Sequence, residues 1–206
     1  MKYTKVLAIF AFLFAVSSLS YASNQTLDDD TDFASEAASV FKIDDNTNYP
    51  NNLALREARK MGLGVAVGGS LGTYGMNIEV NFEDENSGMA GFGGGDGYNS
   101  FHILWKHSFE GDTIAPYFTA GYSRWYNSAR SGDYKKSSVL ERVLTNNEKS
   151  TGPFTTDFLT GAVGLQFTQL TGNMAGTSLY AEIVLLGEVH SEVLVPTGAV
   201  GALYYF

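Results

Sequence analysis

The stretch from Leu194 to Phe206, LVPTGAVGALYYF, decides the fold of this chain. Every second residue, including Val200 and Tyr204, is apolar or small, and the aromatic residues come last. The intervening residues form a smaller and more mixed set. A period of two with one lipid-compatible face is the pattern of a strand that crosses a membrane. The stretch therefore predicts the final strand of a transmembrane β-barrel, with a terminal aromatic side chain turned outward.

The other end of the chain has the pattern of a secretory signal peptide. Lys2 and Lys5 accompany the apolar run of residues 6–16, and residues 20–22 (SYA) supply small side chains where a signal peptidase reads. The run is shorter than the about 20 residues of a spanning helix, which argues against the alternative of an N-terminal anchor. We therefore expect residues 1–22 to be removed from an exported protein. Because the chain has no cysteine, we expect neither disulfides nor thiol-bound metal.

An acidic segment follows. The chain has a formal net charge of -9 at pH 7, and residues 23–60 hold much of the excess. Few apolar residues and one sign of charge predict a disordered segment. Within it, LALREARKM (residues 53–61) is a candidate short helix that could lie at a membrane interface, tuck under the barrel or serve as a polar connector. The acidic balance argues against nucleic acid as a partner. The acidic side chains are Asp28, Asp29, Asp30, Asp32, Glu36, Asp44 and Asp45.

From Met61 to Phe206 strands and turns alternate, which predicts an all-β fold, an eight-stranded antiparallel up-and-down transmembrane barrel. An even number of strands returns both ends of the barrel to the periplasm. The weakest strand is SGMAGFGGG, whose glycines read as a loop on propensity alone; the even count retains it. The expected strands are residues 61–69, 73–83, 86–94, 98–109, 114–126, 154–168, 178–188 and 192–206.

The strand count also sorts the connections. With residue 206 in the periplasm, the joints near residues 83–85, 110–113 and 169–177 lie on the periplasmic side. The joints near residues 70–72, 95–97 and 187–191 and the long connection of residues 127–153 then lie outside the cell, and a long outer loop is typical of bacterial outer-membrane barrels. We expect this loop to contribute little to the backbone pairing of the barrel and to carry a surface contact. Its Val139, Leu140, Val143 and Leu144 are spaced like one short amphipathic helix.

The two faces of the strands indicate the surroundings of the barrel. One face is uniformly apolar and the other carries glycine and polar side chains, whereas a soluble lipocalin-like barrel would have its apolar face inward. A periplasmic β-sandwich would share the alternation but not the closure. In lipid, closure satisfies every backbone group. Aromatic girdles are expected at both interfaces, formed by Tyr74, Phe82, Phe101, Phe109, Tyr122, Tyr126, Phe167, Tyr204 and Phe206.

The opposite face defines the interior. Eight strands enclose a space that side chains can fill, and Tyr117, Trp125, Tyr180 and Tyr205 are expected to occupy much of it. Small inward residues leave room for a cavity or water. The polar network that we expect in the interior comprises Asn77, Glu79, Lys106, Gln166 and Glu182.

Three segments carry a resemblance to a known family: GLGVAVGGSLG at residues 62–72, APYFTAGYSRW at 115–125 and GAVGALYYF at 198–206. In these, residues 61–206 resemble the small eight-stranded outer-membrane β-barrel proteins of Gram-negative bacteria, the OmpA/OmpX/OmpW-like superfamily. The resemblance implies the outer membrane as location, its lipid as surroundings, and recognition of the C-terminal strand by the outer-membrane assembly machinery. It implies no single activity, because such barrels include anchors, adhesins, small channels and a few lipid-modifying enzymes.

The search for catalytic residues finds little. His107 and Ser108 are adjacent on a strand and point to opposite faces, and residues 190–192 (HSE) form an unsupported outer-loop set; nucleophilic catalysis needs serine and histidine within hydrogen-bond reach. No His/Asp/Glu set has the spacing of a metal site. We therefore expect no enzyme, no cofactor and no metal.

The function expected is a structural or surface-interaction role, through the outer loops of a monomer whose surface partner the sequence does not specify. The alternatives are a narrow, porin-like channel for small solutes or a site for a small hydrophobic ligand. A lipid-modifying enzyme ranks third.

Overall fold

The strands of this protein form one closed barrel. The computed structural model describes residues 48–127, 137–191 and 193–206. In this part of the chain, eight antiparallel strands pair in chain order, and β8 pairs back with β1. The predicted fold class is therefore confirmed. The predicted signal peptide and the acidic side chains before residue 46 lie outside the described residues.

The strand limits agree with the prediction within two residues. The glycine-rich β3 forms because β2 and β4 pair with it along its whole length, so tertiary pairing overrides its low strand propensity. The strands are β1 (Met61–Gly68), β2 (Tyr74–Asn81), β3 (Asn86–Gly95), β4 (Tyr98–Ser108), β5 (Ile114–Asn127), β6 (Phe154–Thr168), β7 (Thr177–Glu188) and β8 (Leu194–Tyr205).

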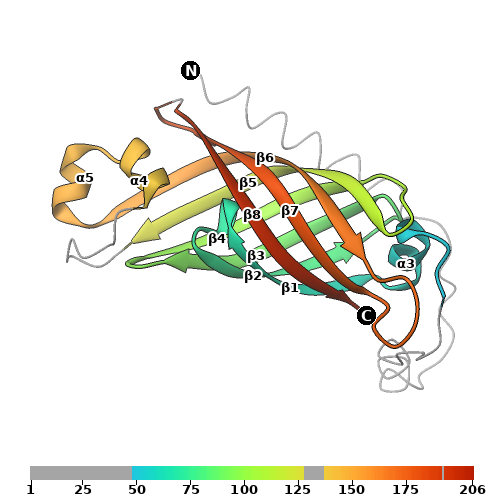
Figure 1. Ribbon diagram of the computed structural model, residues 1–206. Helices are drawn as coiled ribbons and strands as arrows, with labels where there is room; N and C mark the ends of the chain where they lie inside the picture. Colours follow the sequence, from blue (N-terminus) through green and yellow to red (C-terminus); the bar gives the residue numbers. More distant parts are fainter. Residues whose placement is uncertain (1–47, 128–136, 192) are drawn as a thin grey trace, which may run out of the picture. The chain divides into compact units, whose positions relative to one another are not determined.

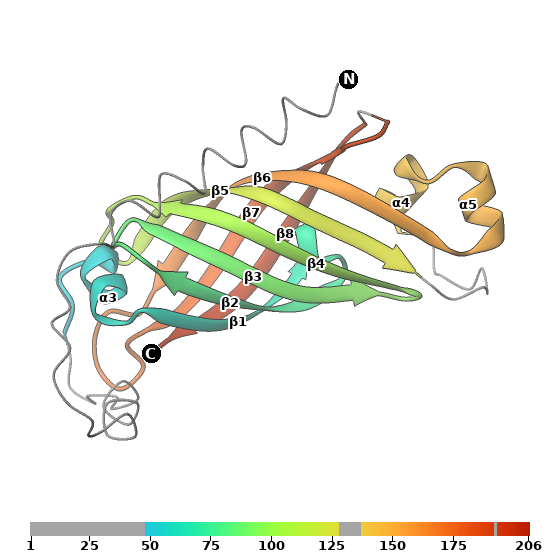
Figure 2. The ribbon, with the colours of Figure 1, turned by 180° about the vertical axis from the view of Figure 1, so that it is seen from behind.

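Short helices lie at both ends of the barrel. α3 (Asn52–Ala58) lies at the end where the chain reaches its C terminus, here called the inner end, and α4 (Ser138–Val143) and α5 (Asn146–Thr151) lie at the opposite, outer end (Figures 1 and 2). A turn of 3-10 helix, η1 (Gly69–Leu71), joins β1 to β2. None of the helices in the described ranges has the length and apolar character needed to cross a membrane.

Burial alternates along the strands with the polarity that the sequence predicts. On β2, Ile78 faces outward with 47% of its surface exposed, whereas its neighbour Asn77 faces the lumen and is 2% exposed. The other strands follow the same rule, so apolar side chains cover the outside of the barrel and many polar ones are buried within it. This polarity is opposite to that of a soluble barrel.

Candidate functional site: the barrel lumen

A buried ionic cluster occupies the inner part of the lumen. Glu79, whose side chain is 0% exposed, accepts a hydrogen bond from Arg56 Nη1 at 2.6 Å on one carboxylate oxygen. Ser87 Oγ donates to this same oxygen at 2.9 Å, and the other carboxylate oxygen accepts a hydrogen bond from Lys106 Nζ at 3.0 Å. Lys106 also donates to Gln166 Oε1 at 2.6 Å. The charges are paired and hydrogen-bonded, the condition under which a protein interior tolerates them.

Of the five residues predicted to form one polar network, three are in contact and two have other partners. The structure brings Glu79, Lys106 and Gln166 together, and places Asn77 and Glu182 on the same lumen face but with tyrosine partners. The side-chain amide of Asn77 donates to the Tyr180 hydroxyl at 3.3 Å, and the Tyr117 hydroxyl donates to Glu182 at 2.8 Å. In the described part of the chain no ion pair joins Glu182 to Lys106; the sequence could show their common face but not their partners.

Arg56 is the charged member of this cluster that the sequence analysis missed. α3 turns its side chain into the barrel, where Nε also donates to the carbonyl of Asp84 at 2.8 Å. Burial alone would lower the pKa of Arg56, but the Glu79 carboxylate and Tyr205 outweigh it and the pKa is raised above its ordinary value. The guanidinium therefore stays charged. The sequence did contain a signal for this burial. Leu55 and Arg59 are four residues apart and therefore share one face of a helix, and Arg56 lies beside that face.

Further contacts fix α3 across the inner end. Arg59 Nη1 donates to the carbonyls of Ala175 at 2.6 Å and Tyr205 at 2.9 Å. The Asn52 side chain donates to the carbonyl of Phe109 at 2.9 Å and accepts from the amide of Gly111 at 2.8 Å. Of the three places proposed for this segment, α3 therefore tucks under the barrel. α3 thus packs against the barrel although it precedes β1, which begins at residue 61.

The connection between β1 and β2, expected as an outer turn, folds into the lumen instead. The carbonyl of Ser70 accepts hydrogen bonds from Ser123 Oγ at 2.7 Å and Trp125 Nε1 at 2.8 Å, and that of Leu71 accepts one from Ser100 Oγ at 2.5 Å. η1 thus blocks the lumen between the ionic cluster and the outer end. The chain reverses through positive φ angles that glycine adopts without strain, at Gly68 (86°), Gly69 (70°) and Gly72 (90°).

η1 also forms a serine–histidine pair that the sequence did not reveal. Ser70 Oγ lies 2.7 Å from His102 Nδ1, and both side chains are buried inside the barrel. His102 Nε2 has no hydrogen-bond partner among the described residues, whereas a catalytic triad needs a third group that orients the histidine. The geometry fits a contact that holds η1 in place, because Ser70 and His102 are both buried and bonded to each other.

The histidine pairs considered in the sequence do not form a dyad either. His107 points outward against Phe118 (ring centroids 5.3 Å apart), while Ser108 faces the lumen. His190 Nδ1 contacts Glu188 at 3.2 Å, and the amide of Ser191 donates to the same carboxylate; residue 192 lies outside the described residues. No group of three or more His, Cys, Asp or Glu residues that could hold a metal ion occurs in the described ranges.

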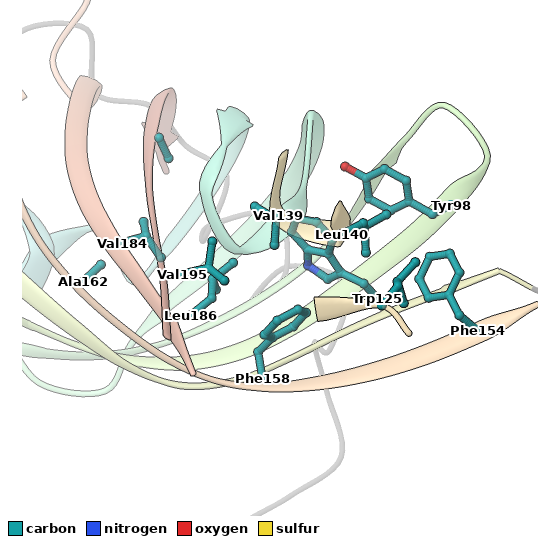
Figure 3. Close-up of a cluster of buried hydrophobic side chains, with 12 residues drawn as sticks. Tyr98, Trp125, Val139, Leu140, Phe154, Phe158, Ala162, Val184, Leu186 and Val195 are labelled. Carbon is teal, nitrogen blue, oxygen red and sulfur yellow. The ribbon is translucent and has the colours of Figure 1, made fainter. Parts of the chain in front are cut away.

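The outer end of the lumen is filled by an apolar cluster, in contrast to the charged and polar contacts of the inner end. α4 inserts Leu140, together with Val139 and Leu144, among side chains of β4 to β8, and Figure 3 shows Val139 and Leu140 beside the indole ring of Trp125. The loop therefore contributes apolar side-chain packing to the barrel, which the expectation about its backbone pairing did not include. The buried members of this outer cluster are Tyr98, Trp125, Val139, Leu140, Leu144, Phe154, Phe158, Ala162, Val184, Leu186, Val195 and Ala199.

Two of the cavities that the described residues form within the lumen are small. Each leaves about 10 Å³ open to the centre of a water molecule, which is room for about one water. One lies between the ionic cluster and η1, lined by Asn77, His102 and Thr119 among others, and the second lies beside α3. Neither has the volume to pass or hold an organic solute.

The outside of the barrel carries the aromatic residues predicted for two girdles. Trp105, Phe109 and Phe118 also cluster on β4 and β5, with Trp105 and Phe118 centroids 5.2 Å apart. Of the predicted set, Tyr74, Phe82, Phe109 and Phe167 are exposed, and Phe101, Tyr122, Tyr126, Tyr204 and Phe206 are half-buried.

The barrel has a polar interior and an apolar outer surface, which is the arrangement expected of a transmembrane barrel. The chain is an eight-stranded barrel with a filled lumen. No protein-family model matches it, and no curated protein matches it. It is similar to the N-terminal β-barrel domain of Pseudomonas aeruginosa OprF, at 12% identity and a TM-score of 0.48 over 70% of this chain and 97% of that one. It is also similar to the Yersinia pestis outer membrane protein Ail, at 14% identity and a TM-score of 0.39 over 72% of this chain and 99% of that one.

Proposed function

We propose that this protein is a sealed, monomeric outer-membrane β-barrel without catalytic activity, which anchors a polar cap, formed by α4 and α5, at the cell surface. One observation carries the proposal: beneath an apolar outer surface the lumen is filled at three levels, by Arg56 and its partners, by η1 and by α4. The apolar surface fits lipid as surroundings. The filled lumen disfavours the narrow channel that the sequence left open.

Conductance and gel mobility test the sealed barrel. The purified protein should migrate differently before and after heating, because a closed barrel has no edge from which to unravel. In planar bilayers it should give no steady conductance. A stable open current from the unmodified protein would overturn the seal, and identical migration with a loss of β-structure in detergent would overturn the barrel.

The surface role rests on the outward face of the cap. Glu141, Arg142, Asn146 and Asn147 are exposed there, so a partner would meet a polar surface. α5 has no buried residues, whereas α4 fills the outer cluster. Deleting residues 146–151 should therefore leave the barrel heat-modifiable while weakening adhesion of whole cells to host or bacterial surfaces. Unchanged adhesion on every surface to which the intact protein confers binding would contradict the role of the cap.

A second candidate function, binding of a small hydrophobic ligand, is favoured by how α4 is held. In the described part of the chain no hydrogen bond or ion pair joins α4 to a strand, and apolar side chains alone fix it over the outer cluster. The acyl chain of a small ligand could displace these side chains of α4 and occupy their place in the outer cluster.

The two tryptophans of the chain allow a test. In a Trp105→Phe variant, Trp125 reports from the outer cluster alone, and in a Trp125→Phe variant Trp105 reports from the lipid face. A brominated fatty acid that enters the barrel should quench Trp125 saturably at concentrations that leave Trp105 bright. Equal, unsaturable quenching of both would exclude the site.

A further inference from the structure

The segment before β1 forms a strap across the inner end of the barrel. This inner strap, residues 49–59, consists of α3 and its flanking residues, and its side chains bond to each of the three inner turns. Arg56 donates to the carbonyl of Asp84 in the β2–β3 turn, Asn52 to that of Phe109 before the β4–β5 turn, and Arg59 to that of Ala175 in the β6–β7 turn. All three acceptors are backbone carbonyls, so the strap depends on where the turns lie and not on their side chains.

Two arginines of the inner strap also converge on the last strand. Arg59 Nη1 donates to the carbonyl of Tyr205 at 2.9 Å, and Arg56 Nη1 donates to the hydroxyl of the same residue at 3.3 Å. Both arginines are buried, at 7% and 2% exposed. Arg59 lies two residues before β1 and Tyr205 ends β8. These bonds therefore cross the seam, the line along which β1 pairs with β8 and the barrel closes.

The seam is a short pairing. β1 pairs with β8 from Gly62 to Gly68, whereas β5 pairs with β6 from Ile114 to Asn127. Glycine in a strand interior weakens it, and β1 also has one at position 64. β1 pairs with β2 over a similarly short stretch, but η1 joins those two strands covalently, whereas the seam joins the first strand to the last. Opening the barrel there would expose two unpaired strand edges.

We propose that the inner strap is a clamp that holds the seam closed, and that it determines how long the folded barrel survives. Contacts between the two ends of a chain come after chain closure, and interactions that are absent from the transition state slow unfolding with little effect on folding. The inference does not depend on the proposed surface role, because it concerns only the inner end.

Kinetics of folding and unfolding in lipid vesicles test the clamp. Arg59→Gln removes the charged donor of two buried carbonyls and should raise the unfolding rate in urea about tenfold or more, while the folding rate stays within about twofold. Lys60→Gln, at the neighbouring exposed position, is the matched control and should change neither rate. An unchanged unfolding rate in Arg59→Gln, or a loss in the folding rate alone, would overturn the proposal.

Introduced disulfides show whether the strap acts through the seam. The chain has no cysteine, so a pair of introduced cysteines has no competing partner. Val65 and Ala202 face each other across the seam, and Ile78 and Ala90 face each other across β2 and β3. With Val65→Cys and Ala202→Cys oxidised, Arg59→Gln should no longer accelerate unfolding. With Ile78→Cys and Ala90→Cys oxidised, the acceleration should persist.

Equal acceleration with either disulfide would show that the strap stabilises the barrel without clamping the seam, and would overturn the proposal. If Arg59→Gln fails to fold, Tyr49→Phe takes its place. This change removes only the hydroxyl that accepts from Arg59 Nε at 3.2 Å. It should give a smaller acceleration of unfolding that the seam disulfide abolishes and the β2–β3 disulfide does not, and the absence of that difference would overturn the proposal in the same way.

Discussion

Glu79 shows how one residue can organise the interior of a membrane barrel. It faces two cations, Arg56 and Lys106, and accepts a third hydrogen bond from Ser87. Breaking such a buried set by removing one partner is costly because the remaining charges stay buried and uncompensated.

Replacing Glu79 by glutamine should therefore destabilise the protein strongly. The change leaves Arg56 and Lys106 together without a carboxylate, and we expect a loss of about 3–5 kcal/mol of unfolding free energy. Urea titration in lipid vesicles measures it. Glu57→Gln, on the exposed side of α3, is the matched control and should change little. Similar small effects of both variants would show that the ionic cluster does not stabilise the barrel.

The limits of sequence reasoning are visible at this scale. Alternation places Glu79 and Lys106 on the lumen face, but a period of two cannot say that they meet across β3. Arg56 could not be paired at all, because its position depends on the path of α3 beneath the barrel. The pair of Ser70 with His102 was hidden for the same reason: GGSLG predicts a turn, and nothing local says that the turn points inward.

At the scale of elements, the two ends of the barrel are closed by different physics. α3 is fixed by charged and polar contacts to the inner turns and to β2, whereas the contacts that hold α4 among the described residues are apolar. The sequence predicted the amphipathic spacing of α4. It did not predict that the apolar face would enter the barrel, because the sequence pattern alone does not place that face against the lumen.

Two leucines of α3 allow the contribution of packing to stability to be distinguished from that of helix formation. Leu55 is fully buried, while Leu53 is half-buried. Leu55→Ala should cost about 2–5 kcal/mol of unfolding free energy, the range for a buried leucine, and Leu53→Ala clearly less. The measurement is again urea unfolding in vesicles. Equal losses would mean that α3 is not packed into the inner end.

Leu140→Asp should release α4 from the outer cluster, because a carboxylate cannot be buried there without a partner. Trypsin added to intact cells should then cut after Arg142 faster than in the unmodified protein, while the strands survive. Glu141→Asp, on the exposed side of the same helix, should leave the rate unchanged. If Leu140→Asp leaves the cleavage rate unchanged, α4 does not depend on the cluster.

At the scale of the whole molecule, the fold was predictable to a large extent. Strand number, order and limits all follow from a period of two together with the rule of even strand count, and β3 was kept on that rule against its own propensity. What no periodicity contains is the filling of the lumen by segments outside the strands. Those segments determine whether the barrel has an open pore or a filled lumen.

The outward surface supplies the corresponding prediction. Ile78→Arg places a charge on the lipid face of β2 and should lower the unfolding free energy by about 2–4 kcal/mol near the midplane. Thr155→Arg lies on an exposed position at the outer end of β6 and should cost little. The folded fraction in vesicles, read from gel mobility without heating, distinguishes them. A greater loss at Thr155 would mean that the barrel sits at another depth.

The contact of Arg59 with the carbonyl of Tyr205 spans 146 positions of the chain. The bond therefore joins the segment before β1 to the strand that closes the circle, and it can form only once β8 is in register. Contacts so distant in sequence form late, because chain closure must precede them. We therefore predict that α3 reaches its place only after the eighth strand has paired, and that added protease cuts residues 48–60 more slowly after that step than before it.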